Sequence, residues 1–140
     1  MPYAVLIGRI LFSLVFIMSG INHLTNVEAM SQYAAANGVP APTAAVILSG
    51  LLILAGGLSV MLGYRARIGA WLLVVFLIPT AFLMHGFWGI EDAMMQQNEM
   101  AHFLKDLALA GGALLITHFG AGPLSLDQRL AATETASSAA

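Results

Sequence analysis

TAAVILSGLLILAGGLSVML, residues 43–62, contains no charged side chain. It is long enough to cross a bilayer as a helix, because about 20 apolar residues span the hydrocarbon core. Three further apolar segments of similar length flank it, over residues 3–21, 66–88 and 101–119. Backbone groups in lipid have no water to bind, so such segments form helices. The sequence therefore predicts an all-α integral membrane protein, built as a four-helix bundle.

Composition supports the same fold class. Of the 140 residues, 59% are hydrophobic and only 9% are charged, whereas soluble domains carry about 25% charged residues. The net charge of −2 argues against a nucleic-acid partner, which would need a basic surface. The absence of cysteine excludes thiol relays and cysteine-ligated iron–sulfur clusters. We expect one membrane domain over residues 1–122 and a partly disordered cytoplasmic tail over residues 123–140.

The positive charges predict the orientation of the bundle. Arg9, Arg65 and Arg129 would all lie on one side of the membrane, as would Arg67. The connections over residues 22–42 and 89–100 contain neither lysine nor arginine. Cytoplasmic loops carry the excess of basic residues, so we expect both termini inside.

This topology collects ionisable side chains near the outer ends of three helices: His23, His85, His102, Lys105 and Asp106. The last three are spaced i, i+3 and i+4, so they share one helix face. Ionisable residues within membrane spans usually face the bundle interior or a wet cavity. We therefore predict a ligand-binding site made by His85, Lys105 and Asp106, with His102 and His23 as secondary contacts. No catalytic residue is assigned.

Several ligands suit such a site. A histidine with a lysine or aspartate can bind the two carbonyl groups of a quinone, which reaches the site from the lipid. Three histidines, or two with an aspartate, can bind zinc, although no tight metal-binding spacing is present, and we assign no metal ligand. Two facing histidines can ligate haem. A purely structural role also stays open, since Lys105 and Asp106 can neutralise each other. His118 falls at the opposite end and is interpreted as structural.

Other residues indicate packing. Arg9 lies about two turns inside its helix and could reach the inner headgroups or cap a neighbouring helix. Gly56, Gly57 and Gly112 would let helices approach closely. Pro79 has no N–H and leaves the carbonyl one turn earlier without its helical partner.

Five motifs resemble the DoxX family of small bacterial membrane proteins. They are GRILFSLVFIMSGINHL (8–24), ILAGGLSVMLGYRARIGAWLL (53–73), FLMHGFW (82–88), FLKDLALAGGALLI (103–116) and GAGPLSLD (120–127). The resemblance covers about residues 6–127. The matching positions are Gly8-Arg9, Ser19-Gly20, Gly56-Gly57, His85 with Phe87-Trp88, and Lys105. Many members have a lysine where His23 stands and an asparagine where Asp106 stands, so the charge balance of the site differs here.

The resemblance implies a multi-pass protein of the bacterial inner membrane with a role in redox physiology. One relative is the small membrane subunit of a thiosulfate:quinone oxidoreductase. We therefore expect a redox-associated membrane subunit that binds a quinone or similar molecule near the outer leaflet. Because no flavin or nucleotide motif is present, a soluble oxidoreductase partner would supply the electrons. The alternative is a non-catalytic membrane scaffold or assembly factor, and both hypotheses are compatible with an oligomer.

Overall fold

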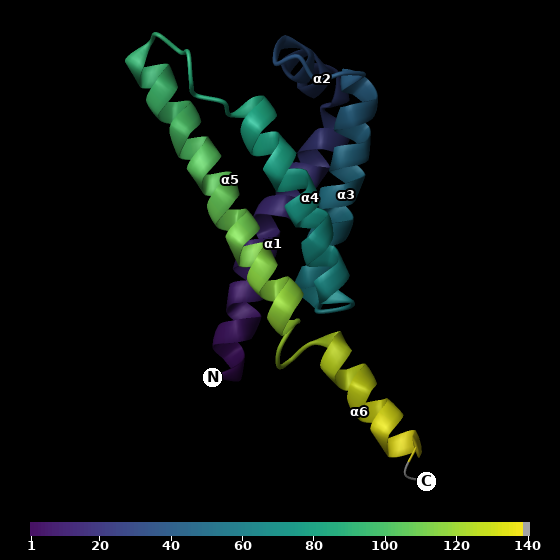
Figure 1. The fold of residues 1–140 in the computed structure, drawn as a ribbon. Coiled ribbons are helices and arrows are strands. Elements are labelled where there is room, and N and C mark those ends of the chain that lie inside the picture. The colour runs from purple at the N-terminus through teal and green to yellow at the C-terminus, as the bar shows by residue number, and fades with distance from the viewer. Residues whose placement is uncertain (139–140) are drawn as a thin grey trace.

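Residues 1–138, the part of the chain that the structure describes, form six helices and no strand in a computed structural model (Figure 1). Four of the helices are long and apolar enough to cross a membrane. In chain order the helices are α1 (Pro2–Thr25), α2 (Val27–Ala36), α3 (Pro42–Leu62), α4 (Ala66–Met84), α5 (Ala93–Phe119) and α6 (Leu126–Ser138). The predicted all-α bundle with four spans is therefore confirmed.

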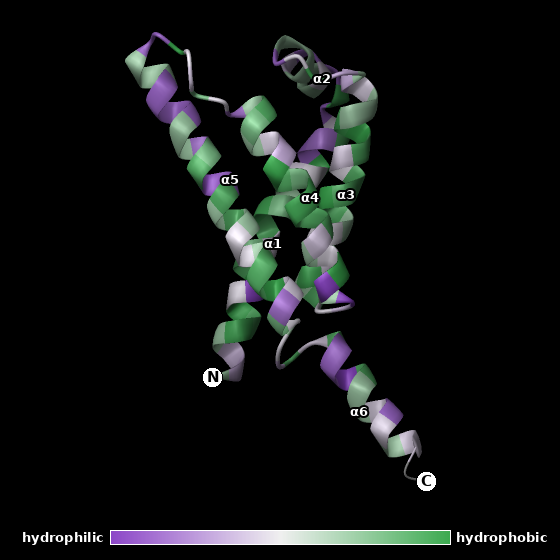
Figure 2. Cartoon of the chain, viewed as in Figure 1, coloured by the Kyte–Doolittle hydropathy of each residue, from purple (hydrophilic) through white to green (hydrophobic). Residues whose placement is uncertain are grey.

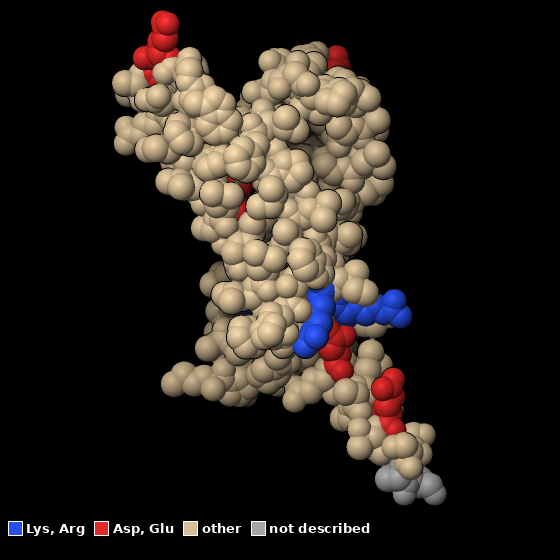
Figure 3. All heavy atoms as spheres, in the orientation of Figure 1, with Lys and Arg blue, Asp and Glu red and all other residues tan. Residues whose placement is uncertain are grey.

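The long helices leave most of their apolar surface uncovered. Only 17% to 33% of the most hydrophobic window of each span is buried inside the protein. Figure 2 shows hydrophobic residues along the middle of these helices and hydrophilic ones toward their ends. On the face shown in Figure 3, blue basic side chains gather at one end and red acidic ones mark the tip where α5 begins, and the surface between them is uncharged apart from a small acidic patch. Such a surface is stable only when lipid or another apolar partner covers it.

The helices do not begin and end where the apolar segments do, because capping hydrogen bonds, rather than hydropathy, determine the helix ends. α4 ends at Met84 and not at residue 88, so His85 follows the helix instead of lying within it. α5 begins at Ala93, about two turns before residue 101, because the Asp92 carboxylate accepts a hydrogen bond from the Met95 N–H at 2.8 Å. α1 continues beyond residue 21 to Thr25.

In the structure the tail contains the helix α6, from Leu126 to Ser138. The Ser125 hydroxyl accepts a hydrogen bond from the Gln128 N–H at 3.2 Å and so caps the first turn.

The spans pack in sequence order, with α1 against α3, α3 against α4 and α4 against α5, while α2 covers one end of α3. Figure 1 shows α5 diverging from the other helices toward the end that carries α2. The core lies where the helices converge and consists of Phe16, Ile53, Val60, Ala70, Leu73, Val74, Leu77, Ala110 and Ala113.

Glycines set the distances between helices. A Cβ at Gly56 would lie 2.8 Å from Leu73 Cδ2 and 2.9 Å from the Gly69 oxygen, so this position lies directly against α4. Gly57, the next residue, faces α1 instead, and Gly112 of α5 lies over a ring edge of Phe12 in α1. Small residues at such crossings allow the close van der Waals contact that holds membrane helices together.

Arg9 ties α1 to the segment that follows α5. Its side chain is almost fully buried, with 5% exposure. One guanidinium nitrogen donates to the Ala121 carbonyl at 2.7 Å, and the other donates to the Leu124 carbonyl at 2.9 Å. The guanidinium therefore binds backbone oxygens just beyond the C-terminus of α5.

Asp127 completes this junction. Its carboxylate accepts hydrogen bonds from the backbone N–H groups of Arg65 at 2.7 Å and Ala66 at 3.1 Å, at the start of α4. Its own N–H donates to the Gly63 carbonyl at 2.8 Å. Gly63 has φ of +65°, and an added Cβ would lie only 2.5 Å from Ser125 Cβ, so the turn needs glycine for both reasons. The junction thus joins α1, the α3–α4 turn and the start of α6.

Candidate functional site

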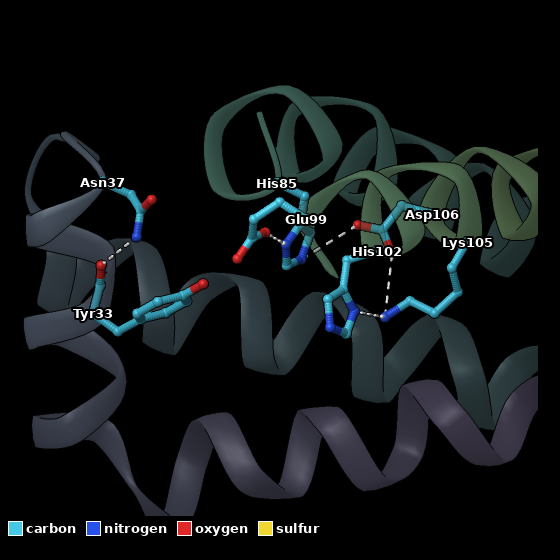
Figure 4. Close-up of polar contacts among 7 residues, drawn as sticks. All are labelled: Tyr33, Asn37, His85, Glu99, His102, Lys105 and Asp106. Atoms are coloured by element: carbon cyan, nitrogen blue, oxygen red, sulfur yellow. Dashed lines mark hydrogen bonds and ion pairs between the residues drawn. The ribbon is translucent and has the colours of Figure 1, made fainter. Parts of the chain in front are cut away.

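A polar cluster joins the end of α4 to the middle of α5 (Figure 4). His85 Nδ1 lies 2.8 Å from Glu99 Oε2, and His85 Nε2 lies 3.8 Å from Asp106 Oδ2. Glu99, His102 and Asp106 are spaced i, i+3 and i+7, so they share one face of α5. Both nitrogens of one imidazole are thus turned toward carboxylates.

His102 and Lys105 extend the cluster along α5. The Lys105 ammonium donates to His102 Nδ1 at 3.2 Å and lies 3.8 Å from Asp106 Oδ1. The rings of His85 and His102 stack with centroids 5.0 Å apart. The Asp106 side chain is buried, whereas that of Lys105 is half exposed. Two carboxylates and one ammonium group thus share the cluster with two imidazole rings.

His23 lies apart from this cluster. Its Nδ1 is 3.0 Å from the Ser49 hydroxyl of α3, and its ring meets Phe76 of α4 edge-on at a centroid distance of 6.2 Å. Ser49 in turn donates to the Val46 carbonyl at 3.1 Å. The ring is therefore held in a fixed orientation at the α1–α3 boundary.

A cavity of about 380 Å³ connects His23 with His85, and both line it. Its walls come from α1, α2, α3 and α4, and most of them are apolar. The apolar contacts include Met30, Val46, Leu52, Phe76 and Leu83. This size and lining are typical of sites for small molecules, which usually combine apolar walls with a few fixed polar groups.

Tyr33 of α2 is a further polar group of the cavity wall. In Figure 4 its ring lies across from the cluster formed by His85 and α5. Burial, together with the negative charge of Glu99, raises the pKa of Tyr33 above its ordinary value. The hydroxyl therefore stays neutral at physiological pH and remains a hydrogen-bond donor.

Comparison with known proteins agrees with this architecture. The model of the DoxX family matches residues 4–86, which run from α1 to the residues just after α4. The chain belongs to the DoxX family. It is 31% identical to the inner membrane protein YphA of Escherichia coli K12, over 91% of each chain. It is 34% identical to the inner membrane protein YqjF of the same organism, over 90% of this chain and 91% of that one. No solved structure matches.

This DoxX protein is therefore a multi-pass protein of the inner membrane. The family model ends just after His85, so Glu99, His102, Lys105 and Asp106 lie outside the matched segment. The two relatives in Escherichia coli nonetheless align over nearly the whole length.

The structure brings together four of the five side chains proposed from the sequence of this DoxX protein: His85, His102, Lys105 and Asp106. The fifth, His23, shares only the cavity with His85. His102, Lys105 and Asp106 do not line that cavity. The predicted single site is therefore two adjoining features, a cavity and an ionic cluster, which meet at His85.

Glu99 was not predicted as a site residue, because hydropathy alone assigns it to a loop. Its spacing of three residues before His102 and seven before Asp106 is visible in the sequence. That spacing indicates a shared helix face only if Glu99 is helical. It is helical because Asp92 caps α5 and so places its first residue at Ala93, before Glu99.

Metal ligation finds little support in this geometry. Within residues 1–138, no group of three or more histidine, aspartate or glutamate side chains is placed to hold a metal ion. The Lys105 ammonium also lies beside Asp106, where it would repel a cation. The stacked rings of His85 and His102 cannot ligate a haem iron from its two opposite sides.

Proposed function

We propose that this protein is a redox-associated membrane subunit that binds a quinone or a similar small ring compound in the cavity between α1, α2, α3 and α4. The observation that carries the proposal is the cavity itself. It holds about 380 Å³, has mostly apolar walls, and has His23 and His85 among its few polar groups. A flat apolar ring with an oxygen at each end suits such walls, because two separated polar groups can fix its orientation.

The two histidines would play different parts. His23 is held by the neutral Ser49 hydroxyl and would orient one end of the ligand. His85 is held by the Glu99 and Asp106 carboxylates and would manage a proton at the other end. Glu99 is one-quarter exposed, so it offers this proton a route to water. A quinone, when bound, supplies two-electron redox chemistry.

The electrons would come from a soluble oxidoreductase partner. The chain contains no cysteine, and its helices carry no flavin or nucleotide motif.

The basic side chains support an orientation with both termini in the cytoplasm, and this orientation would set the cavity near the outer leaflet. Arg65 and Arg67 lie at the α3–α4 turn, and Arg9 and Arg129 lie near the junction at the same end.

Filling the cavity tests the proposal directly. Ala45 lines the cavity, whereas its neighbour Ala44 is exposed on the outside of α3. In lipid nanodiscs, a short-chain quinone should bind to the wild type, and Ala45→Phe should weaken this binding about tenfold or more by overfilling the site. The matched variant Ala44→Phe should bind as the wild type does.

A second variant tests the polar end. His85→Ala should weaken quinone binding, while His118→Ala, at the far end of α5, should leave it unchanged. Failure of the wild type to bind a quinone would contradict the proposal and favour a non-catalytic scaffold. The scaffold is equally favoured if Ala45→Phe binds the quinone as tightly as Ala44→Phe does.

A further inference from the structure

Pro79 leaves one backbone carbonyl of α4 without its usual partner. The residue lies inside the helix, which continues to Met84. In a regular helix the N–H of residue 79 would donate to the carbonyl of Val75, four residues earlier. Proline has no N–H, so this hydrogen bond cannot form.

The position of this carbonyl matters because Val75, Pro79 and Thr80 all line the cavity. Val75 and Pro79 are one turn apart on the same face of α4 and both line the cavity, so the carbonyl that proline leaves unpaired lies between two lining residues. Water is scarce at this depth, and an unpaired polar group there costs free energy. A ligand that donated a hydrogen bond would remove this cost.

We infer that the cavity selects ligands that carry a ring hydroxyl, so that a phenol or hydroquinone binds more tightly than the corresponding quinone or ether. The inference rests on the proposed function and names the form of ligand that the same site prefers. The Val75 carbonyl can only accept a hydrogen bond, and a quinone oxygen can also only accept one. A hydroxyl is the group that satisfies both the carbonyl and itself.

The other polar groups of the cavity do not oppose this preference. The hydroxyl groups of Thr80 and Tyr33 can each donate or accept, so they accommodate either form of ligand. His85 Nδ1 is bonded to Glu99 at 2.8 Å, but its Nε2 lies 3.8 Å from Asp106, beyond hydrogen-bond distance, so this nitrogen can contact either form of the ligand. The Val75 carbonyl is thus a group of the cavity wall that favours the hydroxyl form over the quinone.

A redox-inert pair of probes isolates the effect. Para-butylphenol and its methyl ether have nearly the same shape, but only the phenol can donate a hydrogen bond. In nanodiscs the wild type should bind the phenol about tenfold more tightly than the ether, as expected for one buried hydrogen bond that is otherwise unmet. Pro79→Ala restores the missing N–H and should reduce this ratio to about twofold or less. Pro42→Ala, at the start of α3 and outside the cavity lining, is the matched control.

Retained binding of the ether to Pro79→Ala shows that this variant is folded. Equal binding of phenol and ether by the wild type would overturn the inference, and so would an unchanged ratio in Pro79→Ala. Either result leaves the proposed function standing if a short-chain quinone still binds. Absence of binding by phenol, ether and quinone alike would instead overturn the proposed function, and the inference with it.

Discussion

His85 is the residue at which the cavity and the ionic cluster meet. Its ring lines the cavity, while its nitrogens face Glu99 at 2.8 Å and Asp106 at 3.8 Å. A ligand that moved this ring would therefore change the contacts of both carboxylates on α5. The contact with Glu99 is a hydrogen bond to a carboxylate, and such hydrogen bonds are stronger than neutral ones, so Glu99 holds the ring at the cavity wall.

The pKa of Tyr33 reports whether the Glu99 carboxylate lies near the Tyr33 hydroxyl in solution. Burial is the main cause that raises this pKa, and the Glu99 charge adds to it. We expect Glu99→Gln to lower the Tyr33 pKa while leaving it above the ordinary value of about 10. Ultraviolet absorbance titration of each protein, with its Tyr33→Phe counterpart subtracted, measures the shift.

The sign for stability follows from the same pKa. The folded protein holds the Tyr33 proton more tightly than the unfolded chain does. The resulting contribution to the free energy of unfolding is therefore complete at pH values below the pKa of Tyr33 in the unfolded chain. It is lost as the pH rises through the higher folded value.

Glu91→Gln, in the exposed connection before α5, is the control for the Tyr33 titration. A Tyr33 titration that Glu99→Gln and Glu91→Gln leave equally unchanged would show that Glu99 points elsewhere.

Most of the cluster was predictable from the sequence, because the charges of Lys105 and Asp106 interrupt an apolar segment, where ionisable side chains are rare and usually face the protein interior. The sequence alone could not separate His23 from the cluster. The sequence places all three histidines near helix ends on the same side, and only the packing of α1 against α3 turns His23 toward Ser49. Depth follows from hydropathy, whereas the direction in which a side chain points depends on tertiary packing.

At the level of helices, glycine contacts give a direct test of packing. Gly56→Ala would place a methyl group 2.8 Å from Leu73 Cδ2 and 2.9 Å from the Gly69 oxygen, which belongs to the backbone and cannot easily move. We expect a loss of about 1–3 kcal/mol in the free energy of unfolding. Gly111 of α5 has open space around it, so Gly111→Ala should cost nothing and can stabilise the helix by up to about 1 kcal/mol.

Thermal unfolding in mild detergent, followed by tryptophan fluorescence, compares the two variants. Destabilisation of both to the same extent would indicate that glycine flexibility, and not the α3–α4 contact, is what matters at Gly56.

The existence of the four spans followed from apolar length alone, but their ends did not. α5 extends two turns beyond its apolar segment because Asp92 caps it, and its first two turns are rich in polar residues. α6 has little apolar character, which favours a disordered tail, yet Ser125 and Asp127 anchor its first turn. Hydropathy detects contact with lipid, whereas capping hydrogen bonds decide where a helix starts.

For the whole molecule, the predicted orientation is open to a clean experiment because the chain contains no cysteine. Glu91→Cys marks the connection between α4 and α5, and Thr133→Cys marks α6 at the other end. In intact cells, a membrane-impermeant maleimide should label the first variant and leave the second unlabelled. Both should react after the cells are permeabilised, and the opposite pattern in intact cells would reverse the proposed topology.

The Arg9 junction has a consequence for how the protein is made. The ribosome completes Arg9 among the first residues, but the Ala121 carbonyl that it binds comes 112 positions later. During that interval the guanidinium lies in a membrane helix without the carbonyl groups that it binds in the finished protein. An unpaired cation within a membrane span is costly. A nascent chain released before residue 121 keeps an unmatched charge in its first helix. Finished and truncated copies therefore differ in whether the guanidinium of the first helix has its backbone partners.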